Sequence, residues 1–291
     1  MATADGSLNA RLEEMSPQKV GKLLGFYGSI AALVLVSFFP VIWMLITSLK
    51  PASEAVQFPV TYIPNTITLE NYRIAFEQAP FLRYLFNSFV VASGTAIIDV
   101  FLGALAGYAL SRLDFDYKLP VLLIILFSSM LPFISRLIPL FRLARDTMLL
   151  NDYIGLILPY AAFQLPFAVW IMQAYFKELP ASLEEAGLMD GLTRLGVLFR
   201  IILPVSAPAM ATSAIIVFIY AWNEFLFALT FMTEDKMRTI TVGIALYQGE
   251  YTFPWGTISA AVVLSVVPLL LFMVFFQRKV VEGLTAGFGK A

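Results

Sequence analysis

The stretch LEEAGLMDGLTRLGVLFRIILP, Leu183–Pro204, is a polar insert between two long apolar runs. Just before it, Ser182 lies three residues ahead of Glu185, which is the spacing of a capping box and predicts the start of a short helix. Gly191 predicts the end of that helix, because glycine adopts the left-handed conformation without strain. We expect a second, amphipathic helix to follow and to stop at Pro204. The stretch therefore predicts two short helices joined by a turn.

The rest of the composition is that of a membrane protein. The chain has 291 residues, of which 59% are hydrophobic and only 13% are charged, and its mean hydropathy is +0.82. Soluble domains carry about a quarter charged residues. The net charge of −1 offers no basic face, so we expect no nucleic-acid partner. The absence of cysteine and histidine excludes disulfides, thiolate nucleophiles, imidazole bases and nearly all zinc sites.

Six apolar segments are long enough to cross a bilayer, which takes about 20 helical residues. They are Leu23–Ile46, Asn87–Leu110, Leu119–Phe141, Tyr153–Phe176, Ala207–Leu229 and Thr257–Phe276. The first is too long for a secretory signal and runs into SLKP rather than a cleavage site, so we expect it to be retained. We predict an all-α integral membrane protein with a six-span domain over 23–276, an N-terminal segment 1–22 and a tail 277–291.

The distribution of positive charge predicts the orientation. With a cytoplasmic N-terminus, eleven of the 19 lysines and arginines lie in inner segments and eight in outer ones, which favours that arrangement. Both termini and the loop 177–206, which contains the polar insert between spans four and five, then face the cytoplasm. The insert is either a docking element for a soluble partner or an amphipathic hairpin on the lipid surface.

Prolines recur seven residues apart in two of the predicted spans. Pro132 and Pro139 lie in span three, and Pro159 and Pro166 lie in span four. Each removes a backbone hydrogen bond and is expected to bend its helix. Bent helices often line transport pathways, although membrane helices also tolerate proline where neighbours satisfy the freed carbonyls.

The polar insert and motifs along the chain resemble those of ATP-binding-cassette carbohydrate-importer permeases of the maltose type, most closely the smaller permease of the pair. EEAGLMDG followed by IILP resembles the coupling loop of that family, and SLKP, TLENY, LFNS, AGYALSRLDF, IPLF, LPFAVW, AWNEFLFAL and QRKVVEGLTAGFGK follow in the family's order. The residues that match the coupling motif are Glu184, Glu185, Ala186, Gly187, Asp190, Gly191, Leu203 and Pro204. Gly187 departs from it, because the family usually has alanine there, and glycine softens a helix by up to about 1 kcal/mol.

The resemblance implies a transport subunit rather than an enzyme. It implies a bacterial or archaeal cytoplasmic membrane, a sister permease, two ATP-hydrolysing subunits that dock on the coupling loop and the tail, and an extracytoplasmic sugar-binding protein. ATP and Mg would be bound by the partner subunits and no cofactor by this chain. The sugar is expected to be a di- or oligosaccharide. The alternatives are an ion-coupled secondary sugar carrier, for which we find no clear inverted repeat, and an intramembrane enzyme, which would have few acid–base groups.

Two regions towards the outer side are candidates for the substrate pathway or for contact with the binding protein. Asn223 and Glu224 place an amide and a carboxylate in the outer half of span five, where a hydrogen bond to a neighbouring helix is the alternative. Gln248, Glu250 and Tyr251 lie in the outer loop that, in the family, probes the sugar cleft of the binding protein. Interfacial aromatic residues also serve as membrane anchors.

Asp99 is the remaining candidate, in the middle of span two, where related permeases usually carry an apolar residue. A charged aspartate at that depth costs about 2.5–3.5 kcal/mol. It is therefore protonated, faces a water-filled pathway, or pairs with the sister permease. Its neighbours Thr95 and Gly103 are polar or small, so we predict that Asp99 faces inward and has a structural partner.

Overall fold

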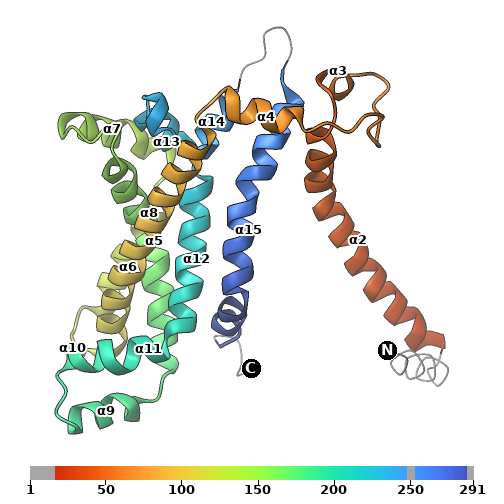
Figure 1. Cartoon of the computed structure of the whole chain (residues 1–291). Coiled ribbons are helices and arrows are strands. Elements are labelled where there is room, and N and C mark those ends of the chain that lie inside the picture. Colours follow the sequence, from red (N-terminus) through yellow and green to blue (C-terminus); the bar gives the residue numbers. More distant parts are fainter. Residues whose placement is uncertain (1–16, 248–252, 287–291) are drawn as a thin grey trace.

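The computed structural model describes residues 17–247 and 253–286, which form helices and loops without a strand (Figure 1). In chain order the helices are α2 (Pro17–Ser48), α3 (Ala52–Ala55), α4 (Glu70–Glu77), α5 (Phe81–Arg112), α6 (Lys118–Ser129), η1 (Ile134–Arg136), α7 (Leu137–Asp146), α8 (Tyr153–Glu178), α9 (Ala181–Met189), α10 (Arg194–Val197), η2 (Leu198–Ile202), α11 (Leu203–Val205), α12 (Ala207–Asn223), α13 (Leu226–Phe231), η3 (Asp235–Met237), α14 (Ile240–Ala245) and α15 (Trp255–Ala286). The predicted all-α class is confirmed.

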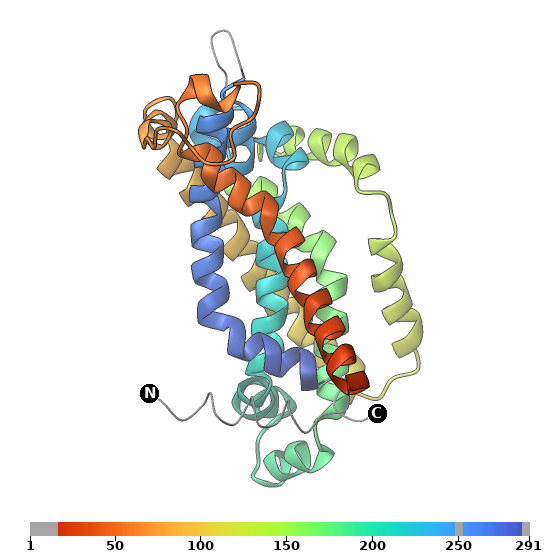
Figure 2. The ribbon, with the colours of Figure 1, turned by 90° about the vertical axis from the view of Figure 1, so that its right-hand side faces the viewer.

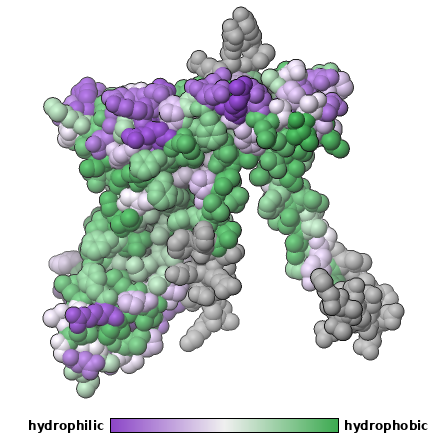
Figure 3. Space-filling model, viewed as in Figure 1, coloured by the Kyte–Doolittle hydropathy of each residue, from purple (hydrophilic) through white to green (hydrophobic). Residues whose placement is uncertain are grey.

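Among the described residues, α2, α5, α8 and α15 are each long and apolar enough to cross a membrane. Two further pairs of helices pass the same criterion together but are strongly bent, so the chain has four to six candidate spans. An apolar belt separates two polar ends of the molecule, as expected for a protein embedded in a bilayer (Figure 3). α15 continues ten residues beyond the predicted end of the last span, to Ala286.

Span three is bent, as its prolines predict, and the bend is a sharp break. Its two halves, Lys118–Ser129 and Ile134–Asp146, meet at an angle of 89°. Pro132 lies in the break, where its missing N–H and its ring oppose a continuing helix. The Arg136 guanidinium donates to the carbonyls of Ser128 and Leu131, at 2.8 and 2.6 Å, and so satisfies groups that the break leaves free. By contrast, α8 runs unbroken over Pro159 and Pro166.

Span five is also shorter than predicted, because α12 ends at Asn223 and not at Leu229. Glu224 is extended, with ψ of 134°, and the chain turns into α13. The Glu224 carboxylate accepts hydrogen bonds from the N–H groups of Phe227 (3.0 Å) and Ala228 (3.1 Å) in the first turn of α13. A new helix start is stabilised in this way when its free N–H groups find an acceptor.

The centre of the fold is the packing of α5 against α8 and α12. A Cβ at Gly103 would lie 2.9 Å from that of Ala168, and one at Gly107 would lie 2.8 Å from that of Met172, so both glycines allow close approach to α8. Gly103 and Gly107 form a GxxxG pair, and this pair packs on α8. Two helices lie outside this centre: only 6% of the apolar segment of α2 is buried, and no residue of α6 is buried (Figures 1 and 2).

Candidate functional site: the loop between α8 and α12

The first helix of the loop, α9, begins differently from the prediction. The residue preceding it is Pro180, which makes no side-chain capping bond, so the predicted capping box of Ser182 and Glu185 is wrong. With φ of −56° and ψ of 133°, Pro180 separates α8 from α9. Pro180 has no N–H with which to continue α8, so the helix ends before it. The boundary between α8 and α9 is therefore set without a side-chain cap.

The turn after α9 has the predicted geometry. Gly191 has a φ of +84°, in the left-handed region. Its N–H donates to the carbonyl of Leu188 at 3.1 Å, and the N–H of Leu192 donates to the carbonyl of Gly187 at 3.0 Å. These two bonds form a Schellman motif, which satisfies the free carbonyls at a helix end. Thr193 then caps the second helix by accepting from the N–H of Gly196 at 3.1 Å.

The second helix does not stop at Pro204, contrary to the prediction. It runs from Arg194 to Val205 and contains a π-helical turn, Leu198–Ile202, directly before the proline. Pro204 is the second residue of α11, which forms the last turn of this helix. The change of direction falls at Ser206 instead, where the chain bends by 77° into α12.

The two neighbouring glutamates of the motif face different surroundings. Glu184 is mostly buried: it accepts a hydrogen bond from the Tyr108 hydroxyl at 2.7 Å and lies 3.8 Å from the Arg112 guanidinium. Arg112 also donates to the carbonyls of Phe176 and Leu179 at the end of α8. Glu184 therefore fastens α9 to the C-terminal end of α5. Glu185 is exposed.

An exposed surface remains on the loop, which lies at the opposite end of the helices from α4 and α14 (Figure 1). Five residues of the coupling motif are exposed on it, namely Glu185, Ala186, Asp190, Gly191 and Pro204, while Leu203 is partly buried. Met189 is 88% exposed and Leu195 is 61% exposed, an unusual position for large apolar side chains of a polar loop. A surface of this composition suits contact with another protein.

Gly187 is the one coupling-motif residue that is buried. A Cβ there would lie 2.6 Å from Cδ1 of Ile201 and 3.0 Å from Cγ2 of Val197. The glycine at the position where the family usually has alanine therefore allows α9 to pack closely on the second helix.

At the other end of the molecule, Glu224 is buried and its carboxylate is fully engaged. Besides its bonds to α13, it accepts from the Tyr160 hydroxyl, and its carbonyl accepts from the Thr241 hydroxyl at 2.8 Å. These contacts are of the structural kind that was the alternative to a sugar contact. Asn223 is exposed, and its amide donates to the carbonyl of Ile219 at 2.8 Å. Gln248, Glu250 and Tyr251 lie outside the described residues.

Asp99 is completely buried in α5, so the predicted inward placement is confirmed. Neither of its carboxylate oxygens has a hydrogen-bond partner within the described part of the chain, so no structural partner is found there. A fully covered side chain cannot reach a water-filled pathway or a sister subunit in this conformation. Of the three alternatives, burial favours the neutral, protonated acid, because an unpaired charge is far more costly to bury.

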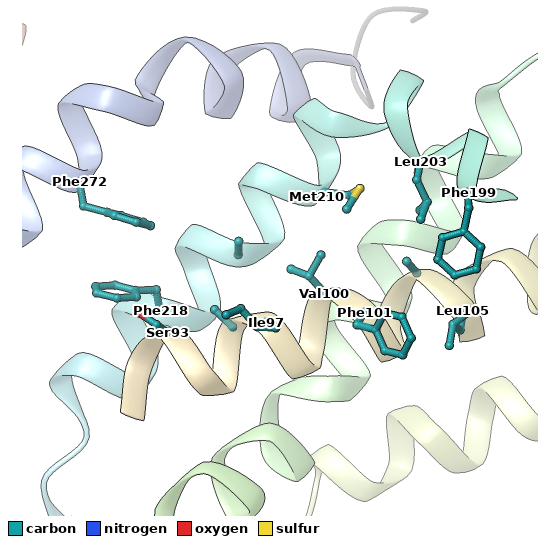
Figure 4. Close-up of a pocket in the computed structure, with 13 residues that line it drawn as sticks. Ser93, Ile97, Val100, Phe101, Leu105, Phe199, Leu203, Met210, Phe218 and Phe272 are labelled. Carbon is teal, nitrogen blue, oxygen red and sulfur yellow. The ribbon is translucent and has the colours of Figure 1, made fainter. Parts of the chain in front are cut away.

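An apolar groove of about 460 Å³ runs along α5 and α12 towards the second helix of the loop and α15 (Figure 4). Its lining includes Ile97, Phe101, Phe199, Met210 and Phe272. Sequence reasoning missed this groove and the anchors Tyr108, Arg112 and Tyr160. Tyr108, in the motif AGYALSRLDF, could not be recognised as an anchor from the sequence, because its role depends on Glu184, 76 positions later.

The class of protein follows from comparison with known families. Residues 99–285 match the family described as "Binding-protein-dependent transport system inner membrane component", and the chain belongs to that family. It is 44% identical over 268 residues to the sulfoquinovosyl glycerol transport system permease protein of Agrobacterium fabrum, covering 92% of this chain and 93% of that protein. It is 40% identical over 276 residues to the trehalose/maltose transport system permease protein of Thermococcus litoralis, covering 94% and 98% respectively.

A solved structure supports the fold. A bacterial ABC transporter involved in the import of the acidic polysaccharide alginate matches with a TM-score of 0.77, covering 91% of this chain and 98% of that chain at 21% identity. The resemblance to carbohydrate-importer permeases stated from the motifs is therefore confirmed, and the chain is a multi-pass inner-membrane component.

Proposed function

We propose that this chain is a permease subunit of an ATP-driven, binding-protein-dependent sugar importer and forms half of its translocation pathway. Its family membership over residues 99–285 is the observation that carries the proposal. The names of the two relatives described above support sugars as the cargo. We propose a di- or oligosaccharide, delivered by an extracytoplasmic binding protein.

We further propose that the chain has six spans, with both bent helix pairs crossing the membrane and with both termini in the cytoplasm. The start of α2 and the end of α15 lie at the same end of the molecule as α9, which supports this topology (Figure 1). The 177–206 loop then faces the cytoplasm together with both chain ends.

A second permease subunit is proposed to pair with this one. The apolar groove, the nearly unburied α2 and α6, of which no residue is fully buried, together present a large apolar surface that this chain does not cover. Lipid can cover part of it, but a pathway between helices also requires a second wall. A sister permease supplies that wall in our proposal.

Two ATP-binding subunits are proposed to dock on the exposed side of α9 and its turn and on the C-terminal tail, and to bind ATP and Mg. Glu185, Asp190 and Met189 offer the contact surface, while Glu184 transmits movement of α9 to α5 through Tyr108 and Arg112. Because this link joins the docking surface to a long central helix, closure of the ATPase pair can move the pathway.

The test is to purify the chain with its ATPase subunits and to measure ATPase activity with and without binding protein and sugar. We expect stimulation that is lost in Glu185→Lys. Glu178→Lys is the matched control, since Glu178 is an exposed carboxylate at the end of α8 but outside the docking surface. Failure to recover any ATPase subunit, or equal loss in both variants, would contradict the proposal.

A further inference from the structure

A polar pocket of about 290 Å³ lies at the end of the helices opposite to α9. Two segments that are distant in the sequence form it: residues 78–84, from the end of α4 into α5, and residues 235–247, from η3 past the end of α14. We call this cavity the rim pocket. Its polar lining consists of Gln78, Tyr84, Asp235, Arg238 and Tyr247. None of these residues belongs to the coupling loop, and the proposed function leaves them without a role.

The charges in the rim pocket balance. The Tyr84 hydroxyl donates to Oδ1 of Asp235 at 2.7 Å, and Nη1 of Arg238 donates to the same oxygen at 2.6 Å. The second carboxylate oxygen of Asp235 accepts no hydrogen bond from the described residues. The pocket thus holds one positive and one negative group that offset each other, with an acceptor still free.

Hydrogen bonds within the chain hold the walls of the rim pocket in place without a ligand. The Asn87 amide donates to the carbonyls of Lys236 (3.0 Å) and Arg238 (2.8 Å), and Ser88 accepts from the N–H of Ile240 at 2.8 Å. These bonds fasten η3 and the start of α14 to α5. A Cβ at Gly243 would lie 2.1 Å from the Tyr84 ring, so the ring rests directly on glycine backbone.

The remaining wall of the pocket is formed by Tyr247 and Gln78, which can both donate and accept hydrogen bonds. The Tyr247 hydroxyl donates to the carbonyl of Ala75 at 2.5 Å, which leaves its oxygen able to accept, and burial raises the pKa of Tyr247 to about 12. The Gln78 side chain is exposed and makes no hydrogen bond within the described chain, so its amide offers both donors and an acceptor. Donors and acceptors therefore lie side by side in a pocket with no net charge.

The chemistry of the rim pocket selects a neutral polyhydroxyl ligand. An anion would meet the Asp235 carboxylate and a cation the Arg238 guanidinium, whereas sugar hydroxyls both donate and accept. The volume is close to the lower limit of drug-sized pockets, about 300–1,000 Å³, so it suits one sugar ring rather than an extended chain. Rigid walls reduce the entropy that such a ligand loses on binding.

We propose that the rim pocket binds one neutral sugar ring of the cargo at the outer mouth of the permease, before the sugar passes between the helices. This inference rests on the proposed function, because it assigns the pocket to the same cargo. It gives this chain a sugar contact of its own, separate from the exposed Asn223.

The test uses the absence of cysteine from the chain. In the complete transporter, Gln78→Cys is labelled with a membrane-impermeant maleimide, and the labelling rate is measured with glucose, maltose, trehalose and glucuronate. Gln57→Cys is the control, since Gln57 is an exposed glutamine at the same end of the molecule but outside the pocket. We expect a neutral sugar to slow labelling at position 78 at least threefold and to leave position 57 unchanged.

Gln78→Ala should raise the sugar concentration for half-maximal import about threefold to tenfold, which corresponds to the loss of one or two hydrogen bonds. Protection by none of the neutral sugars, protection by glucuronate alone, or equal protection by sugar-free binding protein would overturn the pocket assignment. Import is measured separately for each sugar. If a sugar is imported without protecting position 78, only the pocket is refuted; if no sugar is imported, the proposed function fails as well.

Discussion

The two adjacent glutamates of α9 allow the anchoring of the coupling loop to be separated from its docking. Glu184→Ala removes the acceptor of the Tyr108 hydroxyl and the partner of Arg112, whereas Glu185→Ala removes the same side chain from an exposed position. Both substitutions delete one carboxylate from the same helix. They therefore change net charge and helix propensity equally, and any difference between them arises from the contacts of Glu184.

The size of the effect follows from those contacts. A hydrogen bond to a charged group contributes about 1.5–3 kcal/mol. The side chains of Arg112 and Glu184 are only 12% and 13% exposed, so removal of the carboxylate also leaves a nearly buried guanidinium without its ion pair. We expect a loss of about 2–4 kcal/mol in the stability of the α9–α5 contact. That loss multiplies the population of the detached loop by a factor of about 30 to 1,000.

Hydrogen exchange of the backbone amides from 181 to 192 in the purified subunit measures that population. Exchange should accelerate in Glu184→Ala, accelerate less in Glu184→Gln, which retains an acceptor for Tyr108, and stay unchanged in Glu185→Ala. ATPase stimulation in the assembled transporter should fall in both alanine variants. Equal exchange rates in Glu184→Ala and Glu185→Ala would refute the assignment of Glu184 as the anchor.

Three other predictions follow from single positions. Gly191→Leu should disturb the turn at a cost of about 1–2 kcal/mol, seen as loss of ATPase stimulation with normal membrane insertion; full stimulation would contradict it. Asp99→Asn should change the free energy of unfolding of the purified subunit by no more than about 1 kcal/mol, since no donor in the described chain reaches the carboxylate. A larger loss in the full complex would reveal a partner outside the described residues. The N–H of Asn65, and to a smaller extent the Thr61 hydroxyl, donates to the Glu54 carboxylate and holds the pKa of Glu54 below its ordinary value of 4.5. This contact therefore stabilises the segment 54–65 above that pH, and the stabilisation is lost as the pH falls through the lowered pKa. The protection of the amides at residues 61–65 against hydrogen exchange should fall in acid only.

The sequence predicted the long helices well, because twenty apolar residues in a row leave the backbone few other ways to satisfy its hydrogen bonds in lipid. It also predicted the turn at Gly191, since a left-handed position after a helix favours glycine locally. The early end of α12 and the sharpness of the break at Pro132 were not predicted, for a different reason. The start of α13 depends on the carboxylate of Glu224, and at the break the carbonyl of Ser128 is satisfied by Arg136, eight residues further along the chain.

The site was predicted to the level of the loop but not of the side chain. Glu184 and Glu185 are indistinguishable in the motif, because which of them faces inward depends on where α9 meets Tyr108, 76 positions earlier. The rim pocket was beyond reach for the same reason, since its lining residues come from two segments that are distant in the sequence. Asp99 was noticed because an acidic residue in an apolar span is improbable in any context.

The attachment of α2 has a consequence for how the protein is made. The helix is fixed at its C-terminal end, where the Asn71 amide donates to the carbonyls of Ser48 and Lys50 and Ser48 shares a hydrogen bond with Tyr72. It is nearly uncovered along the rest of its length. During synthesis α2 leaves the ribosome before these residues exist. It must therefore enter the bilayer as an independent helix and wait for its attachment. With only 6% of its apolar segment buried in this chain, most of the surface of α2 is left for contacts with lipid or with neighbouring protein.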